Sequence, residues 1–285
     1  MMAEILKGAP AATALDEATR AEVEALLQKG VAPTLAILRV GEREDDLAYE
    51  RGAMKRCEKL GIAVKNVLLP PDVSQAELID TIRKLNGDDA VHGVLMFRPL
   101  PKSLDERAAC AALDPKKDVD GITAGSMAGI YSGSGEGFPP CTAQSCMELL
   151  KYYGVDPAGK RVAVLGRSLV IGKPVSMLLM AANATVTVCH TKTANAPEIA
   201  RIADILVAAA GKEESVGREY LSGGQVVVDV GINWSEKKQK LVGDVDFDAA
   251  LPLVYGISPV PAGVGSVTTS VLAAHVAQAA RKIGA

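Results

Sequence analysis

The first half of the chain alternates between short apolar runs and longer stretches with helical spacing. Aliphatic and β-branched residues predict three strands, at residues 34–40, 64–69 and 91–97. Apolar residues recur at helical spacing over residues 47–60 and 74–85. The first of these predicted helices stops at Gly61, and Ser74 supplies an N-cap for the second. Strands that alternate with helices predict a parallel sheet covered by helices.

A second alternating series follows residues 121–140, a Gly- and Ser-rich stretch of weak periodicity that we interpret as a crossing between domains. Predicted helices lie at residues 142–153, 174–182 and 196–203, and predicted strands at 162–165, 185–189, 205–209, 225–231 and 254–257. This pattern is typical of a doubly wound nucleotide-binding domain. A long apolar helix over residues 264–283 follows, and we expect it to pack back on the first domain. The predicted domains are residues 1–140, together with the helical segment 264–285, and residues 141–263.

Composition narrows the class of protein. The 285 residues are 48% hydrophobic and 23% charged, with a formal net charge of -3, so a general attraction to nucleic acid or anionic membranes is not expected. The five cysteines are scattered and never form a C-x-x-C pair, which favours a reducing cytoplasm over a disulfide framework or a zinc site. With three histidines, a multi-histidine metal centre is not expected either. The sequence shows no secretion signal and no apolar stretch as long as a membrane span.

Residues 161–174, RVAVLGRSLVIGKP, predict a buried strand that turns through glycine into a helix. Such a turn suits a phosphate, because glycine lets backbone N–H groups approach an anion and the helix presents its positive dipole end. A dinucleotide fingerprint reads G-x-G-x-x-G, whereas Gly166 and Gly172 are six residues apart here and Ser168 replaces the middle glycine. Taken alone, the segment is equally compatible with an ordinary strand-to-helix turn.

Four more segments occur in order with this turn: GEREDDLAYERGAMKRCEKL (41–60), GVLMFRPLP (93–101), KDVDG (117–121) and GISPVPAGVG (256–265). Shorter matches are PCT (140–142), ATVTVCH (184–190) and LVGDVDF (241–247). Together they resemble, over nearly the full length, the methylenetetrahydrofolate dehydrogenase/cyclohydrolase family. The resemblance implies an N-terminal αβ folate domain and a C-terminal Rossmann-like NAD(P) domain, with a cleft between them.

The implied reaction is hydride transfer from 5,10-methylenetetrahydrofolate to the nicotinamide, which gives the 5,10-methenyl cation. Many family members then hydrate that cation to 10-formyltetrahydrofolate at the same site. The family also implies a homodimer, formed through the edge of the nucleotide domain. These are expectations from resemblance, as are the residue roles that follow.

Tyr49 matches the family tyrosine that packs along the pterin and aminobenzoate of the folate, and Asp120 matches the carboxylate that reads the pterin's amino and ring N–H edge. A carboxylate suits that edge because it only accepts hydrogen bonds. These two residues are the catalytic candidates. The remaining folate-binding candidates are Phe97, Pro99, Pro261 and Gly263.

The cofactor-binding candidates are Gly166, Arg167, Ser168, Ile171, Gly172, Pro174, His190, Thr191, Gly231 and Ile232. NAD-binding folds usually place an acidic residue about 20 residues after the glycine turn. This chain has His190, Thr191 and Lys192 there instead. With Arg167 they could hold a 2′-phosphate, which favours NADP over NAD, although the family contains members of both preferences.

Two proton-handling positions depart from the family. Four residues after Tyr49 the family carries the lysine central to the cyclohydrolase step, and this chain has Ala53. The family's glutamine partner of that lysine corresponds to Phe97, which Arg98 follows. Hydride transfer needs mainly alignment of donor and acceptor carbons, whereas hydration needs general acid–base chemistry. We therefore expect dehydrogenase activity with weak or absent cyclohydrolase activity.

Three alternatives stay open at this point. One is a fully bifunctional enzyme that uses a rearranged base such as Lys55, although Lys55 lies about 200° round the helix from Ala53 by the helical period. Another is a catalytically silent folate- or nucleotide-binding regulator. The third is a two-domain dehydrogenase of shikimate or amino-acid type. Ala262 and Ser266 also stand where the family usually has Gly and Pro, which leaves the conformation of that loop open.

Overall fold

The structure is a computed structural model that describes residues 3–283. Its chain divides into two compact units, each with its own parallel sheet. The three-stranded unit comprises residues 15–141 and 269–283 of the described chain, and the six-stranded unit comprises residues 3–14 and 142–268. No helix of the described residues is long and apolar enough to cross a membrane.

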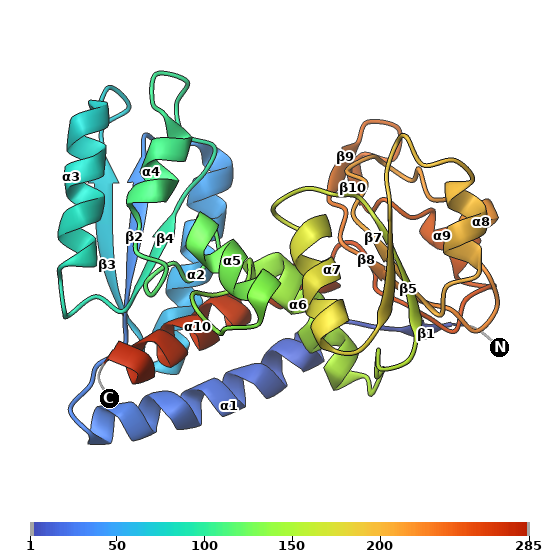
Figure 1. Ribbon diagram of the computed structural model, residues 1–285, viewed down its shortest axis with the longest axis horizontal. Helices are drawn as coiled ribbons and strands as arrows, with labels where there is room; N and C mark the ends of the chain where they lie inside the picture. Colours follow the sequence, from blue (N-terminus) through green and yellow to red (C-terminus); the bar gives the residue numbers. More distant parts are fainter. Residues whose placement is uncertain (1–2, 284–285) are drawn as a thin grey trace. The chain divides into compact units, whose positions relative to one another are not determined.

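The three-stranded sheet has the order β3-β2-β4, with all pairs parallel. Its strands are β2 (Thr34–Val40), β3 (Ala63–Leu69) and β4 (Gly93–Met96). Side chains alternate along β2, so Ala36, Leu38 and Val40 join a core with α3 (Gln75–Asn86) and α4 (Glu106–Ala112). Arg39 points to the opposite face, where it pairs with Glu50 of α2 (Glu44–Leu60). Figure 1 shows α3 and α4 in front of this sheet and α2 behind it.

The six-stranded sheet has the order β1-β11-β8-β7-β5-β6, and every pair in it is parallel. The strands are β1 (Glu4–Ile5), β5 (Arg161–Leu165), β6 (Thr185–Cys189), β7 (Ile205–Ala208), β8 (Val226–Asp229) and β11 (Gly256–Ile257). Helices α7 (Gly172–Ala181) and α8 (Ala196–Arg201) lie on opposite sides of this sheet in Figure 1. The unit is therefore doubly wound, as the alternation of apolar runs predicts.

The predicted elements of both series are present, with bounds that shift by a few residues. Ser74 caps α3 as expected, and its hydroxyl and the Glu77 side chain form a capping box. In the second series α6 (Cys141–Tyr152) precedes β5. The predicted C-terminal helix is interrupted: a 3₁₀ turn at Val264–Ser266 precedes α10 (Thr268–Ile283). From Thr269 onward, α10 belongs to the three-stranded unit.

The structure corrects two features of the predicted organisation. The first residues of the chain do not belong with the N-terminal domain, because β1 pairs with β11 at the edge of the six-stranded sheet. Helix α1 (Gly8–Gln28), which the sequence analysis did not predict, then carries the chain into the three-stranded unit after Ala14.

The Gly- and Ser-rich stretch at residues 121–140 is not a bare crossing. It contains α5 (Ala124–Ser132) and lies wholly in the three-stranded unit, and the chain passes to the other unit between Cys141 and Thr142. Its helix was missed because small residues give α5 little amphipathic pattern. Four short elements were also not predicted, namely α4, β9 (Asn233–Ser235), β10 (Lys240–Val242) and α9 (Phe247–Ala250).

Candidate active site

Tyr49 and Phe97 come together in the three-stranded unit. Their ring centroids lie 6.0 Å apart at an interplanar angle of 84°, an edge-to-face contact. Tyr49 lies on α2, and Phe97 immediately follows β4, on the face of the sheet that α2 covers. Tyr49 is half-buried and Phe97 is 9% exposed. Two of the expected folate-binding side chains are thus adjacent.

Asp120 follows the end of a loop that runs beside β4. Val94 and Asp118 form a parallel bridge, and Asp120 follows in the turn after it, close enough to Arg98 for that guanidinium to lower its pKa. The buried Asp118 carboxylate holds this loop by accepting hydrogen bonds from the N–H groups of Ile122 and Thr123, at 3.0 and 2.8 Å. It also accepts one from the Ser126 hydroxyl at 2.7 Å. Asp118 is not among the predicted site residues, and its hydrogen bonds fix the loop that carries Asp120.

The surroundings of Asp120 favour its neutral form more than water does. Burial raises the pKa of Asp120 to about 6, against a lowering contribution from its hydrogen bond with the Cys141 thiol. His275, on α10, is buried nearby, and its Nδ1 lies 2.9 Å from the Val119 carbonyl oxygen, to which it donates when protonated there. Burial lowers the pKa of His275 to about 4, so this imidazole is neutral at physiological pH.

The position of Ala53 carries no polar group. Its side chain is fully buried in a stripe along α2 that consists of Asp46, Glu50, Ala53, Cys57 and Leu60. Lys55, two residues on, is exposed and lies outside that stripe. Lys55 therefore does not occupy the place that a lysine at residue 53 would have.

Arg98 and Pro99 form the turn after Phe97. The Arg98 guanidinium lies 3.6 Å from the Glu106 carboxylate, and it contributes to lowering the pKa of Asp120. The Pro99 side chain is exposed, and its carbonyl oxygen accepts a hydrogen bond from Arg43 at 3.1 Å. Arg43 precedes α2, so this bond joins the start of α2 to the turn.

The glycine turn of the six-stranded unit is built around close backbone approaches. A Cβ on Gly166, whose φ is +127°, would lie 2.1 Å from the Ala209 carbonyl oxygen. A Cβ on Gly172 would lie 2.2 Å from the Gly166 carbonyl oxygen. Ser168 takes the place of the middle glycine and accepts a hydrogen bond from the Ile171 N–H at 3.1 Å. Although its glycine spacing departs from G-x-G-x-x-G, the segment from Gly166 to Gly172 forms a tightly packed turn.

This turn fits a nucleotide phosphate. The backbone N–H groups of Arg167 and Ser168 donate to no acceptor among residues 3–283, and both residues are exposed. The turn leads into α7, whose N-terminus adds positive potential, with Pro174 buried in its first turn. His190, Thr191 and Thr193 form a second turn after β6, closed by a 2.9 Å hydrogen bond from the His190 N–H to the Thr193 hydroxyl.

Gly231 and Ile232 lie on a loop held by two buried carboxylates. Asp229 accepts hydrogen bonds from the N–H groups of Gly231, Asp244 and Val245, at 2.9, 3.1 and 2.9 Å. Burial raises the pKa of Asp229 to about 6. A Cβ on Gly231 would lie 2.3 Å from the Asp244 carboxyl carbon, so only glycine fits there. Ile232 is 64% exposed, which leaves its side chain available to a ligand.

Pro261 and Gly263 lie on the loop before the 3₁₀ turn, also in the six-stranded unit. Ala262 between them has a φ of +79°, a conformation that strains any residue with a Cβ. Its carbonyl oxygen accepts a hydrogen bond from the Gly8 N–H at 2.8 Å. A Cβ on Gly8 would lie 2.0 Å from the Gly263 carbonyl oxygen, so the start of α1 fixes this loop.

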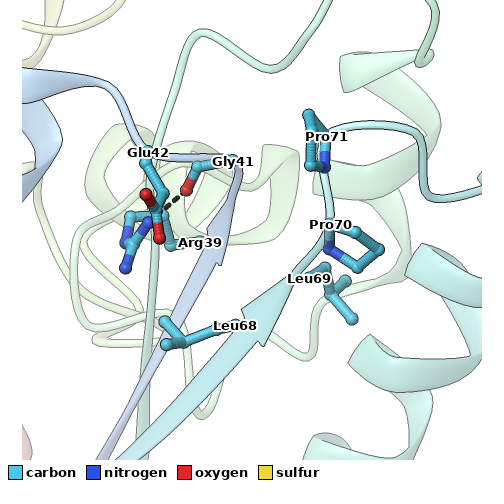
Figure 2. A pocket seen from close by; sticks show the side chains of 7 residues that line it. All are labelled: Arg39, Gly41, Glu42, Leu68, Leu69, Pro70 and Pro71. Atoms are coloured by element: carbon cyan, nitrogen blue, oxygen red, sulfur yellow. Dashed lines mark hydrogen bonds between the residues drawn. The ribbon is translucent and has the colours of Figure 1, made fainter.

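A separate hollow of about 500 Å³ lies at the carboxyl ends of β2 and β3 (Figure 2). It is lined by Arg39, Gly41, Glu42, Leu68, Leu69, Pro70 and Pro71. Figure 2 shows the Arg39 guanidinium turned toward the Gly41 carbonyl oxygen, to which it donates a hydrogen bond. None of the predicted site residues lines this hollow.

Two family models match the chain, each on one half. The catalytic domain of tetrahydrofolate dehydrogenase/cyclohydrolase matches residues 6–120, and the NAD(P)-binding domain of the same family matches residues 140–283. The chain belongs to this family. The resemblance found in the sequence is confirmed, and with it the two-domain α/β fold, whereas a dehydrogenase of shikimate or amino-acid type is set aside.

Relatives and solved structures agree with this assignment. A bifunctional protein FolD of Clostridioides difficile is 49% identical over 278 residues, which cover 98% of this chain and 96% of that protein. The bifunctional FolD of Campylobacter jejuni has a similar structure, with a TM-score of 0.93, 35% identity and 98% of each chain covered. A Trypanosoma brucei FolD, complexed with NADP and an inhibitor, has a TM-score of 0.90 at 35% identity and covers 99% of this chain and 98% of its own.

A buried acidic side chain on α2 was not among the predicted site residues. Asp46 lies one helical turn before Tyr49 and is only 7% exposed. The sequence signal for it was available, since Asp46 heads the same stripe of α2 as Ala53. It was obscured because Glu44 and Asp45 precede it and acidic residues are common in the first turn of a helix.

Proposed function

We propose that this enzyme oxidises 5,10-methylenetetrahydrofolate with NADP⁺ and hydrates the methenyl product weakly or not at all. The observation that carries the second part is that both proton-handling positions hold apolar side chains. Ala53 is fully buried and offers no base, and Phe97 packs edge-on against Tyr49. Water activation at this place has no lysine or glutamine to assist it.

The side chains that remain are suited to holding a folate. Tyr49 offers an aromatic face to the pterin and aminobenzoate, and Asp120 offers two acceptor oxygens to the pterin's donor edge. With a pKa of about 6, Asp120 is mainly ionised at neutral pH and can accept both hydrogen bonds. NADP⁺, when bound, supplies the hydride acceptor, so the residues of this chain have mainly to bind and orient.

The relatives with which the chain shares up to 49% identity bear the name bifunctional protein FolD. We propose that this chain differs from those relatives in cyclohydrolase activity because of its residues Ala53 and Phe97. The alternative of a substitute base at Lys55 has little structural support, because Lys55 is exposed and off the buried stripe of α2. Loss of all activity is also less consistent with the chain, since Tyr49, Asp120 and the glycine turn are all kept.

The preference for NADP⁺ rests on the charge around the second turn. Arg167 and Lys192 are exposed cations, and no acidic residue occurs from His190 to Asn195. A 2′-phosphate is recognised by cations and hydroxyl groups, whereas an acidic residue would bind the ribose hydroxyls of NAD. Initial rates at equal concentrations of NADP⁺ and NAD⁺ test this preference, and faster turnover with NAD⁺ would contradict it.

A homodimer is part of the proposal, formed through β6. This strand ends the six-stranded sheet, and the side chain of Val188 on it is 37% exposed. An open sheet edge with exposed apolar residues is a common place for association. Light scattering of the eluting protein should give twice the 29.6 kDa chain mass, and Val188→Lys should shift the measured mass toward that of a single chain.

The proposed reaction is tested with the purified wild-type chain in two assays. The first follows reduction of NADP⁺ in the presence of methylenetetrahydrofolate, and we expect turnover. The second follows the decay of methenyltetrahydrofolate with and without enzyme, and we expect rates that barely differ. A bifunctional relative such as the Clostridioides difficile FolD serves as the positive control in both. Rapid enzymatic decay of the methenyl compound would overturn the proposal.

A further inference from the structure

The stripe of α2 that carries Ala53 has an unbalanced negative charge at its N-terminal end. Glu50 is neutralised, because the Arg39 guanidinium lies 2.8 Å from its carboxylate and both side chains are buried. Ala53, Cys57 and Leu60 contribute no charge at neutral pH, since burial raises the pKa of the Cys57 thiol to about 12. Asp46 is the acidic group that remains.

The Asp46 carboxylate is poorly compensated by its neighbours. Its side chain is 8% exposed, and its ion-pair partner Arg43 lies 4.0 Å away with a side chain that is 44% exposed. The hydrogen bond that Arg43 donates goes to the Pro99 carbonyl oxygen and not to Asp46. Burial raises the pKa of Asp46, and Asp45 and Glu50 raise it further, against lowering effects of Arg43 and Arg39. A carboxylate held in this way favours a cation placed beside it.

Asp46 lies on the same side of α2 as Tyr49, whose ring contacts Phe97. It lies three residues before Tyr49 and seven before Ala53, so all three share one side of α2. The bond from Arg43 to Pro99 ties this end of α2 to the turn that follows Phe97. Asp46 therefore belongs to the same end of α2, and to the same side of it, as the tyrosine that we assign to the folate.

The proposed reaction creates positive charge at this place. The C–H bond of the methylene carbon breaks, and the hydride carries both bonding electrons into a new C–H bond on the nicotinamide. The folate is oxidised by two electrons and its N5–C–N10 unit becomes an amidinium cation, while the nicotinamide ring becomes neutral. No proton is released in this step.

From the placement of Asp46 we infer that its carboxylate stabilises the cation that forms on the folate, which makes Asp46 a charge-stabilising residue of the dehydrogenase step. The inference rests on the proposed function, because it takes the folate to lie against Tyr49 and Phe97. Together with the neutral Ala53, it makes the site selective for the charged product over the neutral substrate. Groups of fixed charge aimed at developing charge are among the most effective catalytic devices.

The inference is tested by equilibrium binding without any cofactor. The probes are 5,10-methenyltetrahydrofolate, which carries the cation, and tetrahydrofolate, which does not. Asp46→Asn should weaken binding of the cation about tenfold or more and leave binding of tetrahydrofolate within about twofold, since the two ligands differ mainly in that charge. Asp45→Asn is the matched control: it removes the same charge from an exposed neighbouring residue and should change neither affinity.

Two further measurements separate this role from a structural one. Asp46→Glu keeps the charge and should retain most of the preference for the cation, even if its packing is imperfect. In the dehydrogenase assay Asp46→Asn should lower kcat about tenfold with a smaller change in the KM for methylenetetrahydrofolate. Equal loss of affinity for both folates, or no loss for either, would overturn the inference. Failure of the proposed function would show differently, as rapid decay of the methenyl compound with the wild-type chain.

Discussion

The ring of Tyr49 meets the ring of Phe97 edge-on, with centroids 6.0 Å apart and planes at 84°. Phe97 occupies the position at which the family resemblance implies a glutamine, the partner of a lysine at position 53. An aromatic edge gives no hydrogen bond to a water molecule, and the buried methyl of Ala53 gives none either. The contact therefore accounts for the division of activities that we propose.

Restoring both polar groups should restore hydration. In the double variant Ala53→Lys/Phe97→Gln we expect cyclohydrolase activity to rise about a hundredfold above the wild-type level, the usual scale of a general acid–base contribution. Decay of methenyltetrahydrofolate measures it, and reduction of NADP⁺ shows whether the dehydrogenase survives. Each single variant should gain much less, because the two groups act as a pair. A double variant that folds, reduces NADP⁺ and still fails to hydrate would show that another feature blocks the step.

If Lys55 acted as the base of the cyclohydrolase step, its removal would abolish that activity. Lys55 is exposed and lies outside the buried stripe of α2, so Lys55→Ala should leave both activities within about twofold of wild type. If the wild-type chain has a small cyclohydrolase activity, its persistence in Lys55→Ala excludes this lysine as the base. Disappearance of that residual activity, with dehydrogenase unchanged, would instead favour the rearranged base.

The glycine turn should not tolerate a side chain at Gly172. A Cβ there would lie 2.2 Å from the Gly166 carbonyl oxygen, so Gly172→Ala must open the turn. We expect a loss of stability of about 1 to 3 kcal/mol and at least a tenfold rise in the Kd for NADP⁺, measured by thermal unfolding and by calorimetry. Gly223→Ala is a matched control, because a Cβ at Gly223 meets only the Leu253 carbonyl oxygen at 3.8 Å. Its Kd for NADP⁺ should not change.

The elements that could be predicted from the sequence are those with strong local patterns. Apolar runs such as residues 185–189 define strands that the structure reproduces, and Ser74 marks the start of α3 where expected. The place of β1 could not be predicted, because a two-residue strand has no pattern and is defined only by its partner β11. Helix α5 has small residues on all sides, so its periodicity is too weak to identify.

The residues of the candidate site likewise fall into those that the sequence identifies and those that it does not. Tyr49, Asp120 and the glycine turn stand in motifs and could be identified by resemblance. Asp118 and Asp46 were missed, because their roles depend on which backbone groups and charges surround them after folding. An aspartate that accepts three hydrogen bonds and one whose ion-pair partner lies 4.0 Å away look alike in a sequence.

Relief of backbone strain is predicted at Ala262. Its φ of +79° costs an L-residue about 1 to 2 kcal/mol, whereas glycine adopts it freely. Glycine also gains entropy in the unfolded chain, so the net stabilisation of Ala262→Gly should be about 0.5 to 1 kcal/mol. Denaturant unfolding measures this difference. Ala210→Gly, at an exposed residue without positive φ, should destabilise the chain instead, and a loss of stability in both variants would contradict the strain argument.

The pKa of Asp120 predicts opposite effects of one variant on stability and on function. Burial raises the pKa of this carboxyl to about 6 from 3.8, so between these values the folded chain keeps a proton that the unfolded chain has lost. The contribution of Asp120 to stability is therefore greatest below pH 4 and falls as the pH rises through 6. At pH 7.5, ionisation of the Asp120 carboxyl lowers the free energy of unfolding by up to about 3 kcal/mol.

Asp120→Asn removes that cost, because an amide does not ionise. We expect the variant to unfold at a higher temperature than wild type at pH 7.5 and to lose this advantage at pH 4. Asp229 and His275 titrate in both proteins, so comparing the variant with wild type at each pH cancels their contributions. Folate binding should weaken at least tenfold at pH 7.5, because an amide cannot accept both pterin hydrogen bonds. A variant that is less stable than wild type at pH 7.5 would show that the ionised carboxylate is stabilised by its hydrogen bonds more than it is penalised by burial.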